Sequence, residues 1–252
     1  MAVADSEYKL LLSKANDALR LAEIRYDVKT LGFLNPSERA YLKDKLFVQG
    51  DMVLEFDGGY PEAERTLMVC RPEFAEVDRD EYICMLECSG KFTEKLSHRD
   101  YLGSLMGLGI NRECIGDILV FEDKTLIFSK PETAEYIIQN LTKIGRTGIK
   151  IRRCTINDSV VPKRKTKEIS GTVAGIRLDS VISVATGISR GKSAELIKGG
   201  LVTVNWTQTD NVGMSLKEGD VISVRGYGRM CLSKIGGLSG KGRYHITVSR
   251  YV

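Results

Sequence analysis

Two closely spaced helix starts in the last third of the chain constrain the fold more than any other feature of the sequence. Apolar residues recur at intervals of three and four from Leu178 to Ala185, which predicts a helix that buries one face. Gly187 can end this helix in the left-handed conformation, and Ser189 can cap a second helix directly afterwards. Two strand pairs are predicted next, 201–205 with 221–225 and 230–235 with 244–248. Residues 170–252 are therefore expected to form one small α+β domain.

Cationic and hydroxyl side chains stand at both predicted helix starts. Arg177 and Asp179 open the first helix, and Ser189 and Arg190 open the second. Adjacent helix starts collect donors on one surface, and arginine can bind a phosphate through two donors, which suits an RNA backbone. Asp179 repels phosphate, so we expect it to orient Arg177 or cap its helix; Ser189 is explained equally well by capping or by RNA contact. The candidate RNA-binding residues are Arg177, Asp179, Ser189, Arg190, Lys192, Ser193, Lys198, Arg225, Arg229 and Lys241, of which the last four are second-tier surface cations.

The distribution of charge points to the same segment. The chain has 37 Lys and Arg against 33 Asp and Glu, a net charge of +4. Residues 170–252 hold 11 basic and 5 acidic residues (net +6), so the remainder holds 26 and 28 (net −2). This asymmetry favours a nucleic-acid-binding module attached to a near-neutral body, although many soluble proteins have a basic end without such a role. The preceding residues 156–169 are predicted to be an exposed basic linker, whose cations are either solvated or add phosphate contacts.

The rest of the chain predicts two further domains, which makes the fold class α+β. Residues 1–75 are predicted as a helical N-terminal α+β domain, because apolar residues keep helical spacing from Leu12 to Ala22 and Asn35 begins a capping box. Residues 76–155 alternate as β-α-β-β-α-β, the ferredoxin-like order. That topology serves many functions, and the aromatic strand signature of RNA-reading sheets is missing from it.

A helix start at Ser97 invites a catalytic interpretation of His98 and Asp100. Residues two apart on a helix do not face each other, and the neighbouring Ser97 is the expected capping residue of this helix. Helix capping explains the pattern. The alternative is a second RNA or partner contact through His98, Arg99 and Tyr101.

Composition argues against a metal, a cofactor or a membrane anchor. The six cysteines are scattered through apolar segments without a Cys-x-x-Cys pair, and the chain has two histidines, so reduced core thiols are expected. No apolar run approaches the roughly 20 residues of a membrane helix, and no secretory signal is visible. Glycine-rich runs at 107–112 and 235–242 lack residues that nucleotide-binding loops need. We therefore expect a cytoplasmic protein with no small-molecule cofactor.

A set of residues in the last third of the chain keeps its spacing over about 50 residues: Ile176, Arg177, Leu178, Asp179, Ser189, Arg190, Ala194, Leu196, Ile197, Gly200, Val202, Val204, Asn205 and the run GDVISVR at 219–225. With these residues the segment resembles an αL-type S4 RNA-binding domain. Trp206 stands where that family usually has glycine, which makes the turn after Asn205 atypical.

Three further stretches lie upstream: FLNP at 33–36, LSHRDYLGSLMGLGI at 96–110 and IGDI at 115–118. With them the whole chain resembles one S4 subgroup, the YlmH-like RNA-binding proteins of bacteria and plastids. The resemblance implies an N-terminal domain, a ferredoxin-like RNA-binding domain and a C-terminal S4 domain. It also implies a non-enzymatic role near ribosomal RNA or tRNA, in quality control of stalled large ribosomal subunits.

Two other classes of function compete with this one. S4 domains often accompany RNA-modifying enzymes, and a pseudouridine synthase has its catalytic aspartate in an Arg-Leu-Asp run. Here that run opens the predicted helix pair, and 73 residues follow Asp179. A protein–protein adaptor is the other alternative, with the near-neutral residues 1–155 binding a partner, and it is compatible with RNA binding.

Overall fold

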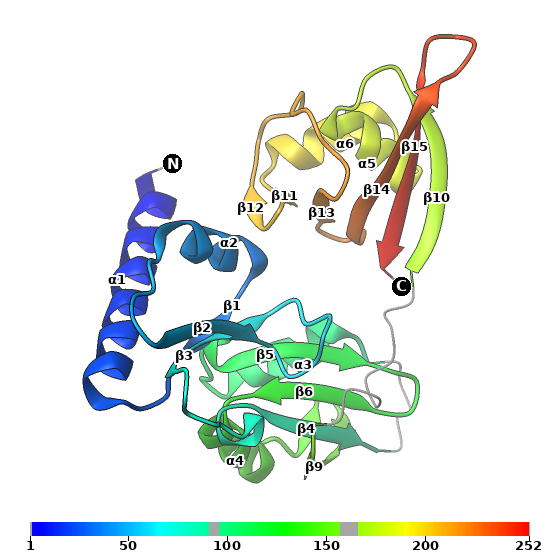
Figure 1. The fold of residues 1–252 in the computed structure, drawn as a ribbon. Coiled ribbons are helices and arrows are strands. Elements are labelled where there is room, and N and C mark those ends of the chain that lie inside the picture. The colour runs from blue at the N-terminus through cyan, green and yellow to red at the C-terminus, as the bar shows by residue number, and fades with distance from the viewer. Residues whose placement is uncertain (1, 91–95, 157–165, 252) are drawn as a thin grey trace. The chain divides into compact units, whose positions relative to one another are not determined.

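The structure, a computed structural model, describes residues 2–90, 96–156 and 166–251. Both units combine helices with antiparallel sheets, as is typical of the α+β class (Figure 1). The chain divides into two compact units, residues 1–161 and 162–252.

The first unit begins with two helices and a three-stranded antiparallel sheet of order β1-β3-β2. Asn35 caps the second helix as the sequence predicts: its Oδ1 accepts the Glu38 N–H at 3.0 Å, and the Glu38 carboxylate accepts the Asn35 N–H at 2.6 Å. The elements are α1 (Ala2–Arg25), β1 (Lys29–Leu34), α2 (Pro36–Lys45), β2 (Met52–Asp57) and β3 (Thr66–Pro72).

A second antiparallel sheet, of order β5-β6-β4-β9, follows with two helices. The second of these helices ends at Asn140, and Gly145, at φ +57, lies in the turn that joins β7 to β8. The elements are η1 (Arg79–Glu81), β4 (Cys84–Ser89), α3 (His98–Gly107), η2 (Arg112–Cys114), β5 (Ile115–Val120), β6 (Thr125–Ser129), α4 (Pro131–Asn140), β7 (Lys143–Ile144), β8 (Thr147–Gly148) and β9 (Lys150–Cys154).

The two sheets of the first unit pack face to face. Along β3, Leu67 and Val69 join a core with Met85, Leu126 and other residues of the second sheet. The alternate β3 residues, Met68 and Cys70, pack instead toward α1 and α2. The segments 1–75 and 76–155 therefore share a hydrophobic core, and the structure does not separate them at residue 75.

Gly116 and Asp117 of the IGDI run lie where the two sheets of the first unit pack together. A Cβ at Gly116 would lie 2.7 Å from the Phe33 ring, so the close approach of the two sheets requires glycine there. The buried Asp117 carboxylate accepts hydrogen bonds from the Tyr60 hydroxyl and from the backbone N–H groups of Glu64 and Arg65.

The second unit is a six-stranded antiparallel sheet of order β10-β15-β14-β13-β11-β12 with two helices. Its elements are β10 (Thr166–Val173), α5 (Leu178–Thr186), α6 (Arg190–Lys198), β11 (Val202–Val204), β12 (Thr207–Gln208), β13 (Val221–Val224), β14 (Gly228–Leu238) and β15 (Tyr244–Tyr251).

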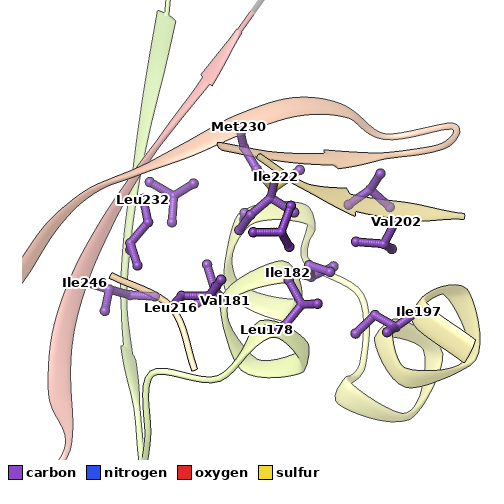
Figure 2. Close-up of a cluster of buried hydrophobic side chains, with 14 of the residues drawn as sticks. Leu178, Val181, Ile182, Ile197, Val202, Leu216, Ile222, Met230, Leu232 and Ile246 are labelled. Carbon is purple, nitrogen blue, oxygen red and sulfur yellow. The ribbon is translucent and has the colours of Figure 1, made fainter. Parts of the chain in front are cut away.

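Both helices of this unit cover one face of the sheet. Leu178, Val181 and Ile182 of α5 and Ile197 of α6 are fully buried among strand residues such as Ile222 (Figure 2). Gly187 ends α5 at φ +76, the left-handed conformation that the sequence predicts. The predicted helix pair and strand pairs are thus present.

Strand β10 was not predicted. It pairs with β15 along eight residues, from Thr166 opposite Tyr251 to Val173 opposite Tyr244. It begins inside the range 156–169 predicted as a linker, so residues 166–169 belong to the sheet, whereas 157–165 lie outside the described residues.

Candidate nucleic-acid interface

A buried carboxylate holds two arginines at the surface of the second unit. Arg190 donates from Nε and Nη2 to Asp179 Oδ2 at 3.0 and 2.5 Å, and Arg177 Nε lies 3.4 Å from Asp179 Oδ1. The Asp179 side chain is 6% exposed, whereas those of Arg177 and Arg190 are 51% and 57% exposed. The carboxylate therefore lies behind the two guanidinium groups, which face solvent. This is the orienting role predicted for Asp179, extended to a second arginine.

The loop at 211–216 fixes the position of Arg177. Leu178 N–H donates to the Met214 carbonyl at 2.9 Å, and Asp179 N–H donates to the Val212 carbonyl at 3.4 Å. Arg177 itself forms a β-bridge with Ser215. The first N–H groups of α5 are thus satisfied by the protein. At this helix start the exposed donors are therefore the arginine side chains, and not these backbone groups.

The start of α6 is a capped helix terminus. Ser189 Oγ accepts the Lys192 N–H at 3.2 Å, so its hydroxyl is engaged in capping. Ser193 is fully buried, and its hydroxyl donates to the Ser189 carbonyl at 3.2 Å, so the prediction of a surface contact through Ser193 is corrected. Lys192 is exposed and lies 2.9 Å from Glu195, whose carboxylate raises the pKa of the lysine. Lys192 therefore remains a candidate for phosphate contact.

The second-tier cations lie on several elements of the same unit. Lys198, Arg225 and Lys241 are exposed, in the last turn of α6, after β13 and between β14 and β15. Arg229 is half-buried: its Nε donates to Ser223 Oγ at 3.3 Å, and its guanidinium lies 5.7 Å from the centre of the Trp206 ring. Hydrogen bonds and ion pairs thus link Arg177, Asp179 and Arg190 directly, whereas Arg229 belongs to a different cluster.

The alternative contact at the start of α3 is only partly exposed. Tyr101 is 1% exposed within a core cluster, so it is not available to RNA or a partner, which corrects that prediction. His98 and Arg99 are exposed. The Asp100 carboxylate accepts from the Ser97 N–H at 2.8 Å and hydroxyl at 2.6 Å, and these hydrogen bonds lower the pKa of Asp100. Helix capping accounts for this aspartate.

Two structural features near the candidate residues were not predicted. One is the 211–216 loop, which carries a readable signal, because Asn211 Oδ1 accepts the Gly213 N–H at 3.1 Å in the turn that an Asn-x-Gly run favours. The other is the contact between Trp206 and Arg229: the arginine was predicted only as a surface cation, and the unusual tryptophan after Asn205 was a visible signal.

The cysteines and acidic residues show no metal-binding arrangement in the described parts of the chain. Burial raises the pKa of both Cys70 and Cys88 to about 12, so these thiols stay protonated near neutral pH. No helix within residues 2–90, 96–156 or 166–251 combines the length and apolar character that a membrane span needs.

Known proteins match both parts of the chain. A family model described as "Putative RNA-binding domain in YlmH" matches residues 75–158, and the S4 domain model matches residues 176–222. The "Ribosome-associated protein quality control protein P2" of Bacillus subtilis (strain 168) is 31% identical over 245 residues, which cover 96% of this chain and 95% of that protein. A solved structure, "Cell division protein ylmH from Streptococcus pneumoniae", is similar with a TM-score of 0.50 at 20% identity, over 59% of this chain and 92% of that one, and supports the fold alone. The identity to the Bacillus protein over nearly the full length shows that the chain belongs to the YlmH family of S4-domain RNA-binding proteins.

Proposed function

We propose that this protein binds structured RNA without catalysing its modification, and that the solvent-facing guanidinium groups of Arg177 and Arg190 grip the RNA backbone. The observation that carries the proposal is the buried Asp179 carboxylate, which holds both arginines in place. An arginine fixed in this way loses less conformational freedom when it binds a phosphate than a free one. The net charge of +6 for residues 170–252 adds long-range attraction.

The RNA that we propose is ribosomal RNA or tRNA on the large ribosomal subunit. The support is the Bacillus relative, which is named for ribosome-associated quality control and aligns with nearly all of this chain. Such a role places the protein in the cytoplasm, where ribosomes translate. S4-type contacts to shape and backbone suit folded RNA of this kind.

Residues 76–155 are proposed to be a ferredoxin-like RNA-binding domain, with the N-terminal segment packed on it. The order β4-α3-β5-β6-α4-β9 and the sheet order β5-β6-β4-β9 support this topology. In many domains of this topology RNA stacks on the open sheet face. Here Phe33, Leu67 and Val69 occupy part of that face, so RNA contact by this domain is proposed at its edges or loops, where His98 and Arg99 are exposed.

The proposed contacts predict the salt dependence of binding. Arg177, Arg190 and Lys192 are exposed cations at the starts of the two helices. Release of the counterions of three phosphates gives a slope of log K against log salt of about −2 to −3. A steeper slope would show that cations such as Lys198, Arg225 or Lys241 also contact RNA.

The pseudouridine synthase alternative requires an aspartate that reaches a substrate. Asp179, in the Arg-Leu-Asp run, is buried and paired with two arginines, so its position speaks against a catalytic role. Incubation of the wild-type protein with ribosomal RNA and tRNA, followed by nucleoside analysis, tests this alternative. Altered nucleosides would contradict the non-catalytic proposal.

The test of RNA binding is sedimentation of tagged protein with cell extract through a gradient, at low and moderate salt. We expect the wild type and a Lys234→Ala control, which removes an exposed cation of β14, to migrate with the large subunit and to dissociate as salt rises. Arg177→Ala/Arg190→Ala should stay at the top. Because this variant leaves Asp179 buried without its arginines, a further Asp179→Asn change and a thermal melt control for unfolding.

Two results would contradict the proposal. If all variants stay at the top of the gradient, the assignment to the ribosome is wrong. If the folded double variant still migrates with the large subunit, the arginine pair does not carry the contact.

A further inference from the structure

Trp206 adopts a backbone conformation that is unfavourable for its side chain. It follows Asn205 in the two-residue turn that joins β11 to β12, where Val204 pairs with Thr207. The φ angles of Asn205 and Trp206 are +48° and +64°. Two positive φ values are typical of a type I′ turn, which favours asparagine and then glycine. Asparagine fits its position, whereas a bulky tryptophan with positive φ is an outlier.

A hydrogen-bond network imposes this conformation on the turn. Asn205 N–H donates to the Val221 carbonyl at 2.8 Å, and Asn205 Oδ1 accepts the Val221 N–H at 2.9 Å. Asn205 Nδ2 donates to Asp220 Oδ1 at 2.9 Å, and the Asp220 side chain is itself buried. Backbone strain that the surroundings hold in place in this way occurs most often where a side chain has a function.

The Trp206 indole does not pack in the hydrophobic core of the second unit. Among the described residues, the core cluster includes Val202 and Ile222, which point toward the helices (Figure 2), and Trp206 is not part of it. Trp206 is partly exposed and contacts a cation instead: the Arg229 guanidinium lies 5.7 Å from the ring centre. Ser223 Oγ, which accepts from Arg229 Nε at 3.3 Å, helps to orient that guanidinium.

The surrounding sheet face is polar. Thr203, Ser223 and Arg229 are paired side by side across β11, β13 and β14. They alternate with the core-facing residues of the same strands, so they lie on the face turned away from α5 and α6. The cluster thus combines an aromatic ring, a guanidinium and hydroxyl groups on a face that the helix pair does not cover.

We infer that Trp206 and Arg229 form a stacking site for an unpaired RNA base. An aromatic ring offers a base a π-face, and a neighbouring arginine adds cation–π and phosphate contacts, the combination that single-stranded RNA sites use. This inference rests on the proposed RNA-binding function and deepens it: the arginine pair at Asp179 grips the backbone, and Trp206 takes a base that is not paired. Glycine would satisfy the turn better, but it would remove the stacking surface.

The chain offers a direct probe, because Trp206 is its single tryptophan. Intrinsic fluorescence of the full-length protein therefore reports on this site alone. We expect a single-stranded RNA of mixed sequence, about ten nucleotides long, to quench the emission in a saturable way, as stacking on the ring requires. A blunt RNA duplex of equal charge should bind through the arginine pair and leave the emission nearly unchanged.

Variants separate a structural role of Trp206 from the proposed one. Trp206→Gly relieves the strain, so its melting temperature should be equal to or higher than that of the wild type. Its affinity for labelled single-stranded RNA should nevertheless fall by about 5- to 150-fold, the effect of losing one stacked base. Trp206→Phe keeps an aromatic ring and should retain most of the affinity. Tyr244→Ala, which removes an exposed tyrosine of β15, is the matched control and should bind as the wild type does.

The outcomes distinguish this inference from the proposed function. If RNA binds the wild type and Trp206→Gly equally well and the emission does not change, the stacking site is wrong while RNA binding stands. A Trp206→Gly variant that melts at a clearly lower temperature would assign the tryptophan a structural role and overturn the inference. If RNA quenches the Trp206 emission in Arg177→Ala/Arg190→Ala as it does in the wild type, the stacking site stands and the arginine pair is not the main RNA contact. If no RNA binds at all, both are overturned.

Discussion

Replacement of Asp179 by asparagine tests whether the two arginines must be held in place. Asparagine has nearly the same shape as aspartate, but it loses the negative charge that pairs with Arg177 and Arg190. The arginines keep their own charges, so the number of cations at the surface does not change. Any loss of RNA affinity then measures their positioning and not their charge.

Two opposing terms set the expected size of the effect. Immobilising a flexible side chain costs about 0.5–1.5 kcal/mol, so releasing two arginines weakens RNA binding by about 1–3 kcal/mol. Removing a carboxylate favours binding by about 0.7 kcal/mol, if a phosphate lies about 6 Å away in a water-like medium. The positioning term exceeds the charge term. The net expectation is an affinity reduced by about 2- to 50-fold.

The assay is a salt titration of the dissociation constant for a ribosomal RNA fragment. Asp179→Asn should lower the affinity at every salt concentration and leave the slope of log K against log salt unchanged. Arg190→Ala should reduce the magnitude of that slope by about 0.7–0.9, because one phosphate contact is lost. Lys234→Ala, an exposed cation of β14, should change neither quantity. A thermal melt of each variant confirms that it is folded.

Two results would refute the positioning argument. If Asp179→Asn binds as tightly as the wild type or more tightly, the carboxylate does not organise the arginines for RNA. If the slope falls as it does in Arg190→Ala, the carboxylate is needed for the contact itself to form.

Three further predictions concern the rest of the structure. Asn35→Ala removes the capping box with Glu38 and should lower the free energy of unfolding by about 1 kcal/mol in denaturant titrations, whereas no change would mean that the cap is not formed in solution. Gly187→Ala places a Cβ at φ +76 and should cost about 1 kcal/mol; an unchanged melting temperature would contradict that conformation. Burial raises the pKa of Cys70 and of Cys88 to about 12, so both thiols should resist iodoacetamide at pH 8 in the native protein and react once it is unfolded. Because the unfolded thiols ionise near pH 8.5, these two groups should reduce stability as the pH rises above that value, and rapid native alkylation would contradict their burial.

The elements with strong local signals were predictable from the sequence. Asn35, Gly187 and Ser189 end or begin helices as expected, because capping and left-handed conformations depend on a few neighbouring residues. Strand β10 was missed since only Val173 of its eight residues is buried. This edge strand forms by backbone pairing with β15. Its sequence therefore lacks the alternation of apolar and polar residues by which a half-buried strand is predicted.

The errors at the candidate site have one physical cause. Ser193 lies four residues before the buried Ile197, and Tyr101 lies four residues before the buried Leu105. Residues four apart on a helix share a face, so both side chains point inward despite their polar groups. The prediction relied on the polar groups of Ser193 and Tyr101. Their exposure is decided instead by the side of the helix on which each residue lies.

The pairing of the arginines could be anticipated only in part. The short distance from Arg177 to Asp179 along the chain made their contact predictable. The contact between Asp179 and Arg190 depends on how α5 packs against α6. The hydrogen bonds that satisfy the first N–H groups of α5 depend on the 211–216 loop. Such contacts between distant residues follow from the tertiary structure and not from local spacing.

The most direct test of the central claim is to map where RNA touches the protein. Ultraviolet cross-linking of the full-length chain to RNA in growing cells, followed by mass spectrometry of the cross-linked peptides, identifies those residues. The account predicts cross-links at residues 177–192, around the arginines that Asp179 holds, and Lys198, Arg225 and Lys241 would widen that surface. Cross-links confined to residues 1–155, with none in 170–252, would contradict the claim that the S4 helix pair grips the RNA.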